Sequence, residues 1–149
     1  MSDALQELYQ EVILDHNRRP RNFRRIEGGV SQEGYNPLCG DRVTVYLTVE
    51  QGVVTDAAFE GQGCAIAKAS ASLMTENLRG LTVEQARHRF HEFQAMVTAP
   101  LDQPAPPLGK LSVLAGVREF PTRVKCASLA WHAARAVLDG TPAEPVSTE

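Results

Sequence analysis

The chain has 149 residues, a formal net charge of -3 and three cysteines. A chain of this length suits one domain, which buries roughly 68–70% of its unfolded surface and so needs no disulfide or metal merely to hold a core. The net charge argues against a general nucleic-acid binder, because phosphate contacts need a clear basic excess. No apolar run approaches the roughly 18 residues of a membrane span, and the acidic, amphipathic N-terminus does not resemble a signal peptide. We therefore expect a cytoplasmic protein that works without nucleic acid or membrane.

The first half of the chain predicts one helix followed by strands. Apolar residues recur at helical spacing over residues 3–17, and Pro20 ends that helix. Strict alternation predicts a strand over 42–50, and a Gln-Gly turn leads into its hairpin partner over 53–60. A shorter strand near residues 29–33 carries a weaker signal. Between the helix and the strands lie five arginines, which suit either an acidic partner or a solvated linker: Arg18, Arg19, Arg21, Arg24 and Arg25.

The second half is predicted to be helical. A helix over 65–79, which carries Lys68, Ser70 and Ser72, ends at Gly80. The helix is rich in small residues, which favour close packing on the sheet. Thr82 and Gln85 have the spacing of a capping box for the next helix. A loop with four prolines spans 98–108, a short helix covers about 110–118, and a last helix runs from about 121 to 139. Residues 141–149 are expected to form a flexible tail.

The three cysteines all fall near the ends of predicted elements. Cys39 lies in the turn "NPLCGD" before a strand, Cys64 lies between a strand and a helix, and Cys126 lies near the start of the last helix. A reducing cytosol disfavours disulfides, so these thiols are filler, nucleophiles or metal ligands. Cys64 and Cys126 both lie near predicted helix N-termini, where the helix dipole and free N–H groups stabilise a thiolate.

Ligand chemistry leaves two metal readings open. Three thiolates with the carboxylate of Asp41 form a four-coordinate set that suits zinc, and thiolates also suit iron–sulfur clusters. The spacing is not diagnostic, because the chain holds no C-x-x-C and the cysteines are separated by 24 and 61 residues. Scattered cysteines that fill small gaps in the core are the alternative.

Three segments carry a family resemblance. In order, "NPLCGD", "GQGCAIAKASAS" and "RVKCASLAW" resemble the cysteine motifs of the U-type iron–sulfur assembly proteins, the IscU/SufU family. The resemblance covers nearly the whole chain. It implies an α+β fold, a three-stranded antiparallel sheet packed with about five helices, as one compact domain over residues 1–140. It also implies that Cys39, Asp41, Cys64 and Cys126 converge on one exposed metal site.

The chain resembles the SufU branch more than the IscU branch. Lys125 stands where IscU-type proteins carry a histidine, and "FPTRVK" stands where they carry a chaperone-binding L-P-P-V-K motif. The proline-rich loop and the segment to Glu119 look like the SufU-type insertion. That branch implies zinc and a sulfur acceptor for a PLP-dependent cysteine desulfurase, with downstream cluster-assembly or carrier proteins as further partners. The IscU branch implies iron and a scaffold on which a [2Fe–2S] cluster, held by Cys39, Cys64 and Cys126, is built and passed on.

Roles within the site follow from the local sequence. Cys39 lies between Pro37 and Gly40, on the most compliant backbone of the three, so we expect it to accept the sulfur. Asp41 is a hard oxygen ligand among soft sulfurs and is expected to form the weakest bond, although a turn-forming aspartate is its simpler interpretation. Cys64 and Cys126 are expected to anchor the metal. Lys125 is interpreted as solvated.

Other candidates are weaker. His88 and His91 are three residues apart on a helix and suit a metal pair in principle, but a solvated face is the favoured interpretation. His132 lies about 240° around the helix from Cys126, which argues against a Cys–His dyad. Trp131 is expected in the core. A zinc hydrolase needs an open coordination position and a general base, and no glutamate or histidine adjoins the cysteine motifs. A purely structural zinc domain is the third alternative.

Overall fold

The structure is a computed structural model that describes residues 3–37, 40–100, 102–103, 108–140 and 146–147. Helices and strands are grouped along the chain rather than alternating: one helix is followed by three strands, then by the other helices and a two-residue strand. In chain order they are α1 (Asp3–Arg18), β1 (Val30–Asn36), β2 (Asp41–Glu50), β3 (Val53–Gln62), α2 (Ala65–Leu78), α3 (Val83–Thr98), the 3-10 helix η1 (Gly109–Glu119), α4 (Pro121–Leu138) and β4 (Val146–Ser147). Within these residues, the expected α+β fold is confirmed: three antiparallel strands, β1 to β3, pack with five helices, where about five were expected.

The sheet has the order β3-β2-β1-β4. The β1–β2 and β2–β3 pairs are antiparallel, and β4 adds a short parallel pair with Gly34 and Tyr35 of β1. The sequence pattern does not predict this short strand in the tail. Because 141–145 and 148–149 lie outside the described residues, the boundary at residue 140 and the flexible tail remain predictions.

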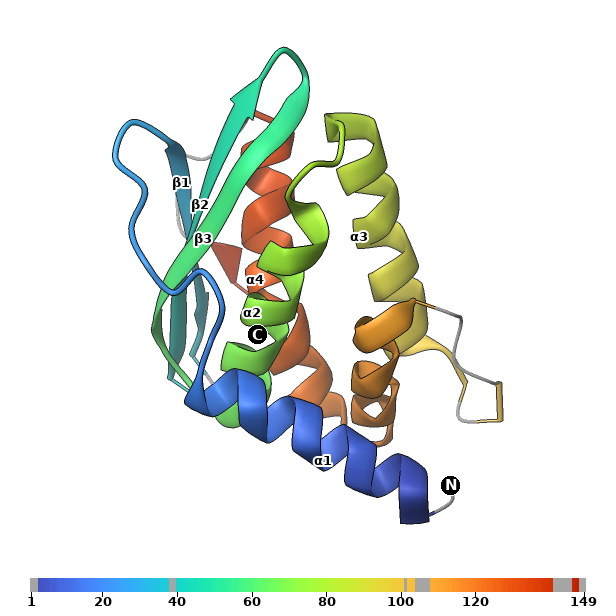
Figure 1. The fold of residues 1–149 in the computed structure, drawn as a ribbon. Helices are drawn as coiled ribbons and strands as arrows, with labels where there is room; N and C mark the ends of the chain where they lie inside the picture. Colours follow the sequence, from blue (N-terminus) through green and yellow to red (C-terminus); the bar gives the residue numbers. More distant parts are fainter. Residues whose placement is uncertain (1–2, 38–39, 101, 104–107, 141–145, 148–149) are drawn as a thin grey trace.

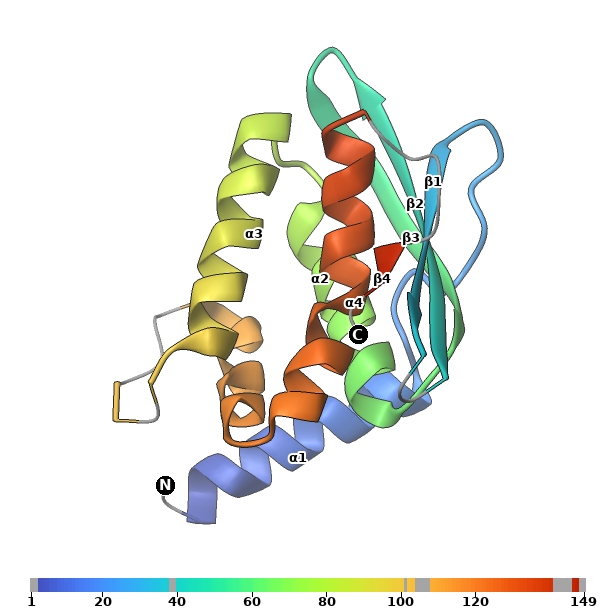
Figure 2. The same cartoon turned by 180° about the vertical axis from the view of Figure 1, so that it is seen from behind.

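The helices form two layers on one face of the sheet. Figures 1 and 2 show α2 and α4 against the sheet, α3 and η1 on the far side of those two helices, and α1 across one end. The inner face of β2 contributes Val43, Val45 and Leu47, which are at most 3% exposed. Gly34 lets β1 approach α4 closely, because a Cβ there would lie 3.1 Å from the Leu129 side chain. This approach sets the start of α4 beside the end of β1.

The connection between α1 and β1 follows the outer edge of β3. Phe59 exchanges backbone hydrogen bonds with this segment: its N–H donates to Asn22 O, and Arg24 N–H donates to its carbonyl, both at 3.0 Å. Further along β3, Val54 N–H donates to Leu81 O and its carbonyl accepts from Gly80 N–H, both at 2.8 Å. The edge of β3 is therefore paired at two places.

Among the described residues, none of the helices combines the length and the apolar character that crossing a membrane requires.

Candidate metal centre

Asp41 is positioned by the turn between β1 and β2. Gly40 N–H donates to Asn36 O at 2.8 Å, and Asn36 and Asp41 face each other as the last pair of the β1–β2 register. Gly40 has φ 74°, a conformation that glycine adopts without steric cost. The turn places Asp41 on the inner, helix-facing side of β2, where the residue is only 2% exposed. Cys39, in the same turn, lies outside the described residues.

Cys64 meets Asp41 at the start of α2. The Cys64 backbone N–H donates to Asp41 Oδ1 at 2.9 Å, and the Cys64 thiol donates to Asp41 Oδ2 at 3.7 Å. Cys64 is also the N-cap of α2, where its sulfur accepts a hydrogen bond from Ala67 N–H at 3.4 Å. This N–H and the positive end of the helix dipole both favour the thiolate, which is the form that binds metals. Cys64 is exposed.

The approach of this turn to Asp41 requires a glycine. A Cβ on Gly63 would lie 2.9 Å from Asp41 Oδ1 and 3.1 Å from its Cγ. The glycine before Cys64 thus leaves room for the carboxylate to reach the Cys64 N–H.

Cys126 comes from α4 and is buried, at 3% exposed. Its sulfur lies 3.9 Å from the side-chain Nδ2 of Asn36, which is 0% exposed. Cys126 lies in the second turn of α4, one turn before the Leu129 contact with Gly34 that fixes this helix against β1. The sequence placed Cys126 near the start of the helix, and the structure agrees.

The three side chains converge although they come from a strand, a loop end and a helix far apart in sequence. One ligand atom each from Asp41, Cys64 and Cys126 lies within 4.8 Å of the others. Ligands about 2.3 Å from a tetrahedral zinc ion lie roughly 3.7 Å apart, so a small contraction brings these atoms to one ion. Two thiolates and a carboxylate fit zinc, and the thiolates also fit iron. Cys64 and Cys126 are both thiols rather than disulfide partners.

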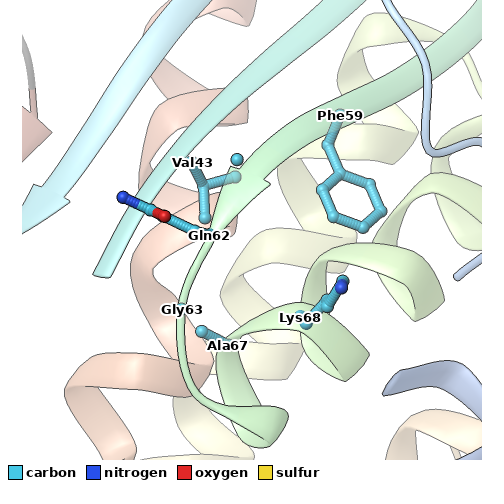
Figure 3. Close-up of a pocket in the computed structure, with 7 residues that line it drawn as sticks. Val43, Phe59, Gln62, Gly63, Ala67 and Lys68 are labelled. Carbon is cyan, nitrogen blue, oxygen red and sulfur yellow. The ribbon is translucent and has the colours of Figure 1, made fainter. Parts of the chain in front are cut away.

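A small pocket lies next to this centre, where β2 begins and β3 ends against the start of α2 (Figure 3). Its lining includes Val43, Phe59 and the Gln62–Gly63 turn. Lys68 also lines it, and its Nζ lies 5.3 Å from the ring centroid of Phe23, a distance that suits a cation–π contact. On the same helix, Ser70 and Ser72 are both 0% exposed. The Ser70 hydroxyl donates to Ala127 O of α4 at 2.6 Å, and Ser72 Oγ lies 2.7 Å from His16 Nδ1 of α1, so these small side chains pack against neighbouring helices.

The remaining histidine and tryptophan candidates lie elsewhere. His88 is exposed and lies 3.8 Å from Glu92, and His91 is exposed, which agrees with a solvated face. His132 packs edge-on against Phe90 of α3, and burial, followed by the nearby Arg135, lowers its pKa. Trp131 is in the core at 1% exposed, as predicted.

The arginine segment is largely engaged within the chain. Arg21 pairs with Asp15 at 2.6 Å, and Arg24 pairs with Asp56 at 2.7 Å. These pairs fasten the segment to α1 and to β3, which favours the linker interpretation over a docking patch.

The buried polar contacts of two residues, Asn36 and His16, were not predicted from the sequence. Asn36 begins the motif "NPLCGD", and its place three residues before Cys39 was the available signal. His16 is 1% exposed and its Nδ1 lies 2.7 Å from Ser72 Oγ of α2. Its position three residues after the buried Ile13, on the same helix face, was the signal there.

Comparison with known proteins agrees with this site. Residues 8–127 match the family described as NifU-like N terminal domain. The chain is 39% identical over 129 residues to the zinc-dependent sulfurtransferase SufU of Bacillus subtilis, covering 87% of this chain and 88% of that protein. It is 39% identical over 133 residues to the iron–sulfur cluster assembly scaffold protein IscU of Thermotoga maritima, covering 88% and 92%.

A solved structure shows the same fold. The putative iron–sulfur cluster assembly scaffold protein for the SUF system from Fervidobacterium islandicum superposes with a TM-score of 0.79 at 32% identity, covering 89% of this chain and 98% of that one. Family match, relatives and fold agree with the resemblance of the three cysteine motifs. The chain belongs to the NifU-like N-terminal domain family and is similar to both SufU and IscU proteins.

Proposed function

We propose that this protein is a zinc-bound sulfur acceptor in iron–sulfur cluster assembly that works with a PLP-dependent cysteine desulfurase. The observation that carries the proposal is the convergence of Asp41, Cys64 and Cys126 within 4.8 Å. In the proposal these residues hold zinc together with Cys39, and Cys39 is the acceptor. The SufU relative, with which the chain shares 39% identity over most of both lengths, supports zinc and sulfur transfer.

The proposed transfer is a thiolate–persulfide exchange. The Cys39 thiolate attacks the terminal sulfur of the partner's cysteine persulfide, forms a new S–S bond, and releases the partner cysteine as a thiolate. No net oxidation occurs, because one S–S bond breaks as another forms. Bound zinc keeps the thiolates deprotonated and protected from oxidation until then. The proposal includes a cytoplasmic setting, whose reducing conditions preserve thiols, and downstream assembly or carrier proteins that receive the sulfur.

The test is a single-turnover reaction with desulfurase and cysteine, followed by mass spectrometry of the product. We expect one added sulfur on Cys39, one zinc per chain, and loss of desulfurase stimulation in Cys39→Ser with the fold retained. Asn77→Leu on α2, remote from the centre, is the control variant. Sulfur on Cys64 or Cys126 would reassign the acceptor.

A second candidate is the scaffold function, which the IscU relatives favour. In this reading Cys39, Cys64 and Cys126 hold a [2Fe–2S] cluster that is passed to other proteins. Anaerobic expression with iron then yields a brown protein with a stable chromophore and no added sulfur on Cys39. A colourless zinc protein that stimulates the desulfurase supports the relay instead.

The other two alternatives have less support. A hydrolase needs a general base, and in the described cluster the one carboxylate, Asp41, already accepts the Cys64 N–H. A purely structural zinc domain unfolds on chelation and leaves the desulfurase unaffected, so the same experiment separates it from the relay.

A further inference from the structure

From the surroundings of Cys126, we infer that Asn36 is a positioning residue for the metal centre: its side-chain amide orients the Cys126 thiolate and lowers its electron donation to the metal. This inference rests on the proposed metal centre and goes beyond its ligands. The key observation is the pair formed by Asn36 Nδ2 and Cys126 Sγ, 3.9 Å apart, with both residues at most 3% exposed.

Burial makes this contact consequential. A buried amide that loses a partner pays its desolvation cost, so the Asn36 side chain has a fixed set of neighbours rather than water. A metal-bound thiolate offers lone pairs and no proton, so the group that faces it must be a donor, which selects the NH2 end of the amide. The contact therefore fixes both the amide and the sulfur in one orientation.

The backbone of Asn36 links this contact to the other ligands. Its carbonyl accepts from Gly40 N–H at 2.8 Å, and the residue pairs with Asp41 across the β1–β2 ladder. One residue thus closes the turn that carries Asp41 and contacts the sulfur that α4 contributes. Such a group sets the relative position of ligands from two elements without binding the metal itself.

The electronic effect has a direction. A hydrogen bond to a thiolate withdraws charge from sulfur, which reduces its donation to the metal. Removal of the amide makes the sulfur a stronger donor and leaves it less well oriented. In a cobalt-substituted protein, the sulfur-to-cobalt charge-transfer absorption should then move to lower energy.

The test uses the full chain loaded with cobalt or zinc, and two variants. Asn36→Ala removes the amide, and Asn36→Leu keeps the number and branching of the side-chain heavy atoms but has no polar atom. We expect both variants to shift the charge-transfer band to longer wavelength. We also expect both to lower the zinc affinity, measured in competition with a chelator, by about 10-fold or more, which is typical for residues that hydrogen-bond to metal ligands. The control is Asn77→Leu, since the Asn77 amide is also hydrogen-bonded but lies within α2, where it donates to Leu73 O at 2.8 Å.

The outcomes separate this inference from the proposed function. Wild-type protein without thiolate-to-cobalt bands overturns the metal centre itself, and the inference with it. Normal wild-type bands, with the same band position and zinc affinity in Asn36→Leu, overturn the role of Asn36 alone. If neither variant folds while Asn77→Leu does, Asn36 serves the fold rather than the sulfur, which also overturns the inference. Equal zinc loss in Asn77→Leu counts against it in the same way.

Discussion

The backbone N–H of Cys64 donates to Oδ1 of Asp41 at 2.9 Å, so one carboxylate both fixes the entry to α2 and faces the sulfur of Cys64. The turn-former interpretation of Asp41 and the ligand interpretation are thus not alternatives. The oxygen that holds the turn and the oxygen nearer the sulfur are different atoms of the same group. Substitutions can separate the two roles.

In Asp41→Asn, the new side-chain amide oxygen can still accept a hydrogen bond from the Cys64 N–H, but the negative charge is lost. Asp41→Ala loses both the acceptor and the charge. We expect Asp41→Ala to lower the unfolding free energy of the metal-free protein by about 1–3 kcal/mol, because a part-buried N–H is left without its acceptor. Asp41→Asn should cost less. Both should release zinc faster, as followed with a chromogenic chelator. Equal release rates in wild type and Asp41→Ala would count against ligation by Asp41.

Cys64→Ser should abolish tight zinc binding, because a neutral hydroxyl replaces a thiolate poorly. Cys126→Ser should do the same and, because Cys126 is buried, should also lower stability. Elemental analysis of protein purified without added metal measures the occupancy, and circular dichroism confirms the fold. Full occupancy in Cys64→Ser would contradict a shared site.

Gly63→Ala should weaken zinc binding, because the new methyl group would lie 2.9 Å from Asp41 Oδ1 and must displace the carboxylate. Gly29→Ala is a matched control: its Cβ would be comparably crowded, 3.1 Å from Leu47 O, but far from the ligands. Both variants should lose stability in urea titration, and only Gly63→Ala should lose zinc affinity. Parallel losses of zinc in both would show that general destabilisation is responsible.

Stability of the metal-free protein should fall as the pH drops through and below the ordinary range of histidine. Burial, followed by the charge of Arg21, lowers the pKa of His16 in the folded protein. The unfolded chain therefore binds a proton at a higher pH than the folded one, and the stability that neutral His16 provides is lost on acidification from about pH 6.5. His132 acts in the same direction. Urea titrations from pH 5 to 8 measure this slope.

His16→Asn is the variant that tests the source of this slope. A short amide can still meet Ser72 Oγ but cannot titrate, so the pH dependence should shrink. The groups that face His16 are Ser72 and Glu76 of α2, its own neighbours Asp15 and Arg21, and Lys110 of η1. Glu76→Gln should lower the His16 pKa further, because a nearby carboxylate stabilises the protonated ring. An unchanged slope in His16→Asn would assign the pH dependence elsewhere.

Local rules predicted the elements with short-range signals. Thr82 and Gln85 form the expected capping box, with reciprocal hydrogen bonds of 3.0 and 3.1 Å. Gly80 and Gly140 follow the helices they were expected to end. The Gln51-Gly52 turn joins β2 and β3, and both residues have positive φ. These signals lie within a few residues of the feature that they specify, which is why sequence alone suffices.

The features that the sequence did not reveal depend on distant packing. The proximity of Asn36 to Cys126 exists only because α4 packs on β1 across Gly34. The burial of His16 depends on the packing of α1 across α2, which places Ser72 Oγ 2.7 Å from His16 Nδ1. The convergence of the ligands on one site was predicted from the family resemblance and not from the cysteine spacing. Spacing carries no information about which elements lie side by side in the fold.

The two edges of the sheet differ in how they resist association with another chain. The outer edge of β3 has its exposed backbone groups paired at Phe59 by residues 22–24 and at Val54 by residues 80–81, so no further strand can add there without breaking these bonds. On the opposite side the last strand is β4, only two residues long. Removing residues 141–149 would uncover the β1 edge and leave unpaired N–H and C=O groups next to the turn that carries Asp41. A chain truncated in this way should self-associate through β1, and the tail would then protect the metal-binding end of the sheet from copies of the same protein.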